Sequence, residues 1–196
     1  MNKAAILILG ALALLAASCA SNRPTQFYTL SPAAMQTAVA PADCAVSVGP
    51  VSVPAALDRP QIVLQTGPNQ VFIAEFDRWA APLKEDIPRV VAHNLASLLG
   101  TSQVTVFPPL TASEASYRVV IDILQLESVS GKEAILDARW TVSSSKDGRS
   151  LSNRMKIAEP ARGGGYAELV AAHSRAFAQL SGRIADTIRE MERQKP

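Results

Sequence analysis

Two segments of alternating apolar and polar residues, together with one long helical stripe at the end of the chain, most restrict the folds open to this chain. Apolar side chains occupy every second position over most of 117–126 and 132–143, which predicts strands that each bury one face. Asp147-Gly148 then predicts a tight hairpin turn into another strand over 150–158. In the middle strand, the side chains expected to face the core are Leu136, Ala138, Trp140 and Val142.

Two helices are predicted around these strands. From Leu83 to Leu98 apolar residues recur at spacings of three and four, and Gly100 is placed to end that helix in a left-handed conformation. Pro88 has no amide proton, so either it lies in the first turn with Asp86 as the cap, or the helix kinks there. The second helix follows the glycines at 163–165.

One apolar stripe runs along this last helix. It comprises Tyr166, Leu169, Val170, His173, Phe177, Leu180, Ile184, Ile188 and Met191. Shorter strands are predicted over 45–53, 61–65, 70–74 and 103–107. Strands joined by local hairpins, with one helix among them and one at the end, predict an α+β domain in which an antiparallel sheet carries two α-helices on one face.

Composition and motifs disfavour several function classes. A net charge of +2, from 19 basic and 17 acidic residues, lacks the basic face of a general nucleic-acid binder, so no nucleic-acid partner is expected. The S-x-x-K pattern at 143–146 falls on a hairpin tip, whereas the serine enzymes that use this pattern carry it at a helix start. His173 has no second histidine one turn away, so no metal site is expected. We therefore expect a protein that is not an enzyme and has no cofactor.

The N-terminus predicts a signal peptide. Lys3 precedes an apolar run from Ala4 to Leu15, which is too short to span a bilayer and has the length of a signal-peptide core. The small residues before Cys19 resemble the lipobox of bacterial lipoproteins. That resemblance implies cleavage after residue 18, diacylglycerol on the Cys19 sulfur and an acyl chain on the new amino terminus. The alternative is an ordinary secretory signal with Cys19 as a bystander.

Three regions follow from this pattern: a lipoprotein signal peptide at 1–18, a lipidated N-terminus and tether at 19–44, and a periplasmic α+β domain at 45–196. A tether of about 25 residues reaches at most about 80 Å. Phe27 to Leu30 interrupts it and is expected to dock on the domain as a short strand. With Cys19 lipidated, Cys44 is either buried and inert or paired with another chain.

Four motifs together resemble the PqiC family, the lipoprotein auxiliary components of ABC-type and MCE-type transport systems. They are Phe27-Tyr28-Thr29-Leu30-Ser31, Val48-Gly49-Pro50-Val51 followed by Pro54, Leu57-Asp58-Arg59-Pro60-Gln61-Ile62-Val63, and Arg78-Trp79-Ala80-Ala81-Pro82-Leu83. The family usually has glutamate where this chain has Ala81. Ala20, in place of aspartate after the cysteine, implies sorting to the periplasmic face of the outer membrane.

The resemblance implies a subunit that docks on a periplasmic MCE-type tunnel protein. It would support lipid trafficking between the inner and outer membranes and envelope integrity, as a homo-oligomer if it forms a ring. Arg78 and Trp79 are residue types that dominate binding hot spots, although Trp79 could equally plug the core. The alternative function is a periplasmic lipid carrier with an internal cavity for acyl chains. The candidate partner-binding residues are Tyr28, Leu57, Arg59, Arg78, Trp79, Pro82 and Leu83.

Overall fold

The computed structural model describes residues 23–33, 41–108 and 115–194. The predicted signal peptide and the predicted lipidation site, Cys19, lie outside these residues. Along the chain, the described elements are β1 (Gln26–Tyr28), β2 (Val46–Ser52), the 3₁₀ helix η1 (Ala55–Leu57), β3 (Gln61–Gly67), β4 (Gln70–Trp79), α2 (Leu83–Leu99), β5 (Val104–Val106), β6 (Tyr117–Val129), β7 (Glu133–Ser144), β8 (Ser150–Pro160) and α3 (Tyr166–Arg193).

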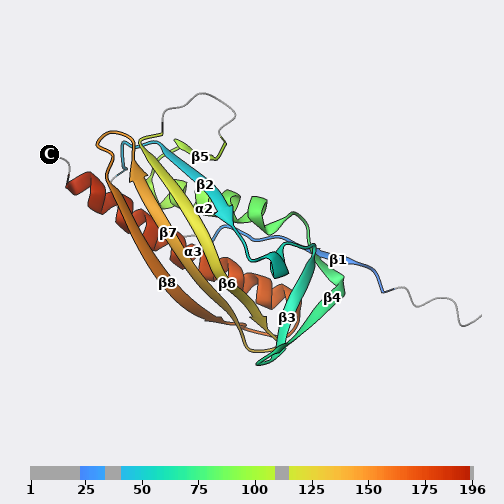
Figure 1. Ribbon diagram of the computed structural model, residues 1–196. Coiled ribbons are helices and arrows are strands. Elements are labelled where there is room, and N and C mark those ends of the chain that lie inside the picture. The colour runs from blue at the N-terminus through green and yellow to red at the C-terminus, as the bar shows by residue number, and fades with distance from the viewer. Residues whose placement is uncertain (1–22, 34–40, 109–114, 195–196) are drawn as a thin grey trace, which may run out of the picture.

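The chain forms one mixed sheet with both helices on one face, which confirms the α+β class (Figure 1). The pairs β6–β7, β7–β8 and β3–β4 are antiparallel, as expected for local hairpins. However, β1 runs parallel to β4, and β2 runs parallel to both β5 and β6. The sheet is therefore mixed where an antiparallel one was expected, because non-consecutive strands choose their partners through tertiary packing.

The long strand β6 organises the sheet. One edge pairs with β7 along its whole length, and the other edge is shared by β2 at its start and β3 at its end. Through β2 the short strand β5 joins the end of the sheet that carries the β7–β8 turn, whereas β3 leads to β4 and β1 at the opposite end. The two ends of β6 therefore carry different sets of edge strands (Figure 1).

The core lies between the sheet and the two helices. The four residues of β7 expected to face it, Leu136, Ala138, Trp140 and Val142, are all buried. The stripe on α3 is also buried from Leu169 to Met191, and only Tyr166 is partly exposed. The alternation in β7 and the helical periodicity in α3 therefore identified the buried faces correctly, because each pattern depends on which side of one element is shielded from water.

A proline precedes helix α2 and a glycine ends it. Pro82 is its N-cap, so Pro88 lies inside the helix and Asp86 is not the cap. Gly100 ends the helix with φ of 65°, as predicted, and a Cβ atom at this position would lie 3.1 Å from Pro41 Cα. The left-handed backbone and the close approach of Pro41 both favour glycine there.

The segment around β1 is built into the domain. β1 pairs with the end of β4, which confirms that this segment docks through a short strand, although the strand ends at Tyr28 and does not include Thr29 and Leu30. Beyond it, Leu30 is part of the core, the Ser31 amide donates to Ser174 Oγ of α3 at 3.1 Å, and the Ala33 amide donates to Asn94 Oδ1 of α2 at 3.2 Å. The folded unit therefore includes residues 23–33, which were expected to be part of the tether.

Candidate docking site

The structure separates the seven predicted partner-binding residues into two groups. Trp79 and Leu83 belong to the core, with exposed fractions of 7% and 3%. The other five lie wholly or partly at the surface, at the end of the sheet formed by β1, β3 and β4: Tyr28, Leu57 and Arg78 are half-buried, and Arg59 and Pro82 are exposed. Three of the four motifs that carried the resemblance therefore meet at this end of the sheet, but two of their residues serve packing.

Trp79 is held by contacts on several sides. Its backbone amide donates to the Pro60 carbonyl at 2.7 Å, and Trp79 lies opposite Tyr28 in the parallel pairing of β1 with β4. Its ring meets the ring of His173 edge to face, with centroids 6.2 Å apart. The open question about Trp79 is therefore answered in favour of the core.

A shallow cavity at the strand-to-helix junction is shared by several motif residues. This junction hollow has a volume of about 450 Å³ and is lined by Phe27, Arg59, Trp79 and Pro82 among others. Because Trp79 is almost fully buried, it forms the floor of the hollow. Arg59 and Pro82 form part of its rim.

A second cavity opens on the sheet face that points away from the helices. This outer hollow has a volume of about 270 Å³, and its lining includes Leu57, Val63, Val71, Ile73 and Leu124. In the β3–β4 ladder Val63 lies opposite Ile73 and Gln65 opposite Val71, so these side chains share one face, whereas Leu64 and Phe72 share the other.

The residues Val71, Ile73 and Leu124 were missed as candidates. The apolar run from Val71 to Ile73 could have been noticed, because a run without alternation indicates apolar side chains on both faces of a strand. However, Leu124 lies between Ile123 and Gln125, where the pairing of β6 with β7 shifts register, and its neighbour in space is set by the pairing of β3 with β6. The exposure of Val71, Ile73 and Leu124 depends on the assembled sheet, because these side chains lie on the face that neither helix covers.

Polar contacts fix the N-terminal segment beside these hollows. The Tyr28 hydroxyl donates to Asp77 Oδ1 at 2.9 Å, and Arg23 forms an ion pair with the same carboxylate at 3.1 Å. Burial and the hydrogen bond to Asp77 raise the pKa of Tyr28. The phenol therefore remains a neutral donor to a buried acid, and β1 stays attached to β4.

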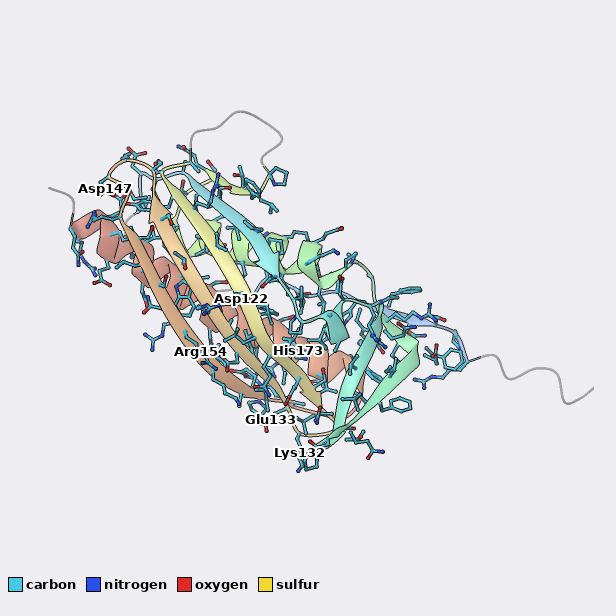
Figure 2. All side chains as sticks on the ribbon, viewed as in Figure 1. Asp122, Lys132, Glu133, Asp147, Arg154 and His173 are labelled. Atoms are coloured by element: carbon cyan, nitrogen blue, oxygen red, sulfur yellow. The ribbon has the colours of Figure 1, made fainter. Side chains whose placement is uncertain are left out.

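His173 is buried among apolar residues, as the stripe predicted. Figure 2 shows it on α3 behind the sheet, and its Nε2 lies 2.8 Å from Ser128 Oγ of β6. Its Nδ1 has no hydrogen-bond partner among the described residues. Burial lowers the pKa of His173 to about 4, so the imidazole is neutral at pH 7.

We expect this histidine to make the fold sensitive to mild acid. Below pH 6.5 the unfolded chain takes up a proton at His173 that the folded chain excludes until about pH 4. The free energy of unfolding should therefore fall by about 2 kcal/mol between pH 7 and pH 5. The carboxyls of Asp122 and Asp137, whose pKa values lie below 3.8, contribute only at lower pH.

Urea unfolding at the two pH values measures this loss. In His173→Gln, which can still bond to Ser128 but does not titrate, the difference between pH 7 and pH 5 should largely disappear. His93 lies on the exposed side of α2, so His93→Gln is the matched control and should keep the wild-type pH dependence. An unchanged pH dependence in His173→Gln would contradict the assignment.

The remaining motifs have structural roles. Residues 143–146 lead into the β7–β8 turn, where Gly148 has φ of 71°. The glycines at 163–165 precede α3, and Cys44 is buried in the core. Within residues 23–33, 41–108 and 115–194, no three His, Cys, Asp or Glu side chains gather as a metal site would require. No helix in this part of the chain is long and apolar enough to cross a membrane.

The fold and the position of the hollows can be stated together. The protein is a small α+β domain whose N-terminal segment is bound between its helices and whose sheet exposes apolar side chains at one end. Residues 28–185 match the family model of ABC-type transport auxiliary lipoprotein components. Because the match spans most of the chain, the protein belongs to this family, which confirms the resemblance. Its role is that of an auxiliary lipoprotein in transport.

Solved structures share the fold. A crystal structure of an uncharacterized protein is 22% identical with a TM-score of 0.70, and the alignment covers 85% of this chain and 99% of that one. A protein from Xanthomonas campestris is 18% identical with a TM-score of 0.65, covering 86% of this chain and 100% of that one. No curated protein matches the sequence.

Proposed function

We propose that the protein is an outer-membrane lipoprotein that docks on a periplasmic MCE-type tunnel protein. Lipidation of Cys19 would anchor it, and the docked domain would support lipid trafficking between the two membranes and envelope integrity without catalysis of its own. Family membership supports the transport role, and Ala20 after the cysteine supports the outer membrane. Docking is the part of the proposal that the geometry addresses.

The observation that carries the docking proposal is the outer hollow. Val71, Ile73 and Leu124 leave 37% to 53% of their surface exposed around it, on the sheet face that neither helix covers. Contiguous exposed apolar surface of this kind marks sites where another protein binds. Leu57 and Arg59 of the family motifs line the same hollow. The outer hollow is therefore our candidate for the tunnel-protein contact.

The lipid-carrier alternative requires an internal cavity that this packing does not favour. Leu136 of β7 and Phe177 and Ile184 of α3 are fully buried between the sheet and the helices. The outer and junction hollows both open at the surface. We therefore rank docking above an internal lipid cavity.

A charge placed in the outer hollow should weaken docking. We expect Ile73→Asp to weaken binding of the tunnel protein by at least about thirtyfold, because an interface that buries an unpaired carboxylate loses 2 kcal/mol or more. The measurement is the dissociation constant of the purified domain for the purified tunnel protein, with the tunnel protein immobilised on a biosensor surface.

Val106 of β5 provides the matched control. It has the same exposed fraction as Ile73, 37%, and lies at the other end of the sheet. Val106→Asp should bind like the wild type, and both variants should unfold at similar urea concentrations. Equal affinities for Ile73→Asp and the wild type would exclude the outer hollow as the docking site.

Native mass spectrometry of residues 20–196 separates the two functions further. A closed homo-oligomer without bound lipid would support a ring that encircles or caps a tunnel. A monomer that retains one phospholipid would instead favour the carrier. The measurement reports the subunit number and the lipid content in one mass.

A further inference from the structure

The domain is attached very close to the residue expected to carry its lipid. Arg23 is the first described residue, and its guanidinium is 3.1 Å from Asp77 Oδ2, a carboxylate on β4 that is only 2% exposed. Cys19 precedes Arg23 by four residues, a length of chain that spans at most about 14 Å when fully extended. The chain between the lipid and the folded domain is therefore far shorter than the tether of about 80 Å that a free segment over 19–44 would form.

The attachment point selects one end of the molecule. β1 lies with β4 and the β3–β4 hairpin at one end of the sheet, whereas β5 and the β7–β8 turn lie toward the other (Figure 1). The residues after Arg23 do not add to the distance between the lipid and the domain, because Leu30 is in the core and its amide donates to Asp86 Oδ2 at 2.9 Å. The end that carries β1 must therefore face the bilayer that holds the lipid.

Three exposed phenylalanines lie on the strands β1 and β4 at this end of the molecule. Phe27 of β1 is 66% exposed, and Phe72 and Phe76 of β4 are 53% and 42% exposed. They are three of the five phenylalanines in the chain. Exposed aromatic rings are favoured at the boundary between lipid headgroups and acyl chains.

The charges at this end balance one another. Lys84 pairs with Asp58 at 3.3 Å, and Arg78 pairs with Glu75 at 3.8 Å. These ion pairs reduce the net charge that could attract or repel anionic headgroups. A contact with the bilayer here would depend on the aromatic side chains and would be only weakly sensitive to salt.

We propose that Phe27, Phe72 and Phe76 form a membrane-contact surface that rests the domain on the phospholipid bilayer holding its anchor. This inference rests on the proposed lipidation of Cys19. It is compatible with docking, because Phe72 and Ile73 point to opposite faces of β4. The bilayer can take the aromatic side chains while the outer hollow stays open to the tunnel protein.

Tryptophan fluorescence in vesicles tests the contact. The full lipidated protein is placed in vesicles of phosphatidylethanolamine and phosphatidylglycerol, with and without brominated acyl chains, which quench tryptophan at short range. Variants Phe27→Trp and Phe72→Trp report the proposed surface, and Val106→Trp is the exposed control at the other end. The wild-type signal of Trp79 and Trp140 is subtracted from each.

Brominated lipid should quench the added tryptophan at 27 or 72 at least about twofold more than at 106, at both low and high salt. Equal quenching at all three positions would overturn the membrane-contact surface. Protection of positions 27 and 72 from aqueous acrylamide without quenching by brominated lipid would also overturn it, and would show that protein covers the aromatic side chains.

The mass of the same sample distinguishes this inference from the proposed function. A protein without acyl chains on Cys19 would overturn both the anchor and the membrane contact. An acylated protein whose added tryptophans are not quenched would overturn the membrane contact alone. Docking is measured separately on the anchor-free domain, so its outcome does not depend on either result.

Discussion

Truncation of Trp79 to alanine is expected to lower the free energy of unfolding by about 3 to 5 kcal/mol. The side chain is almost fully buried, packs its edge against the His173 ring and forms the floor of the junction hollow. Its removal leaves a cavity where β1, β4 and α3 meet, and the surrounding strands cannot collapse into it without losing their hydrogen bonds. Urea unfolding followed by far-UV circular dichroism measures the loss.

The variant Trp79→Phe is the control for size and aromatic character. It should cost much less stability than Trp79→Ala, because it keeps an apolar ring beside His173. Docking by Trp79→Ala should weaken only as far as the fraction of folded protein falls. A variant as stable as the wild type that nevertheless fails to bind the tunnel protein would show that Trp79 acts at an interface.

Replacement of Asp86 by alanine should cost about 3 kcal/mol and free the segment around Leu30. The buried Asp86 carboxylate accepts hydrogen bonds from the Leu30 amide at 2.9 Å, the Thr29 hydroxyl at 3.2 Å and Arg89 Nε at 2.9 Å. Without it, the Leu30 amide is buried with no acceptor in its place. This loss of stability exceeds that for an ordinary surface ion pair, because the acceptor that is removed is a buried carboxylate.

Hydrogen exchange measures this effect at the segment itself. The amides of Leu30, Ser31 and Ala33 should exchange much faster in Asp86→Ala, whereas those of β7 should change only in proportion to global stability. Asp122→Ala is the matched control, because Asp122 pairs with Arg139 at 2.7 Å on the exposed sheet face and should contribute less than about 1 kcal/mol. Unchanged exchange at Leu30 would contradict the role of Asp86.

The fold could be predicted from the sequence wherever a pattern is local. The alternation in 132–143 and the stripe on the last helix each identified the buried face, because a strand or helix that buries one side must repeat its apolar residues with its own period. Asp147-Gly148 identified the position of the β7–β8 hairpin, although the loop between Ser144 and Ser150 is longer than the two-residue turn that this pair favours.

The candidate site could be predicted only in part. The family motifs brought Leu57 and Arg59 into consideration, and both line the outer hollow. Trp79 was equally compatible with a core or an interface role, because its residue type favours both and only its neighbours decide between them. Val71, Ile73 and Leu124 were missed, because the sequence does not show which apolar side chains remain uncovered on the face of the assembled sheet.

By itself, the sequence determined the main element types, the buried faces, the position of the β7–β8 hairpin and the expected lipid attachment at Cys19. The tertiary structure decided the mixed sheet and the position of the N-terminal segment. Both depend on contacts between residues far apart in the chain, such as Leu30 with Asp86 and Tyr28 with Asp77. Periodicity reports the environment of one element, whereas a partner across the fold is chosen by the burial and hydrogen bonds of both.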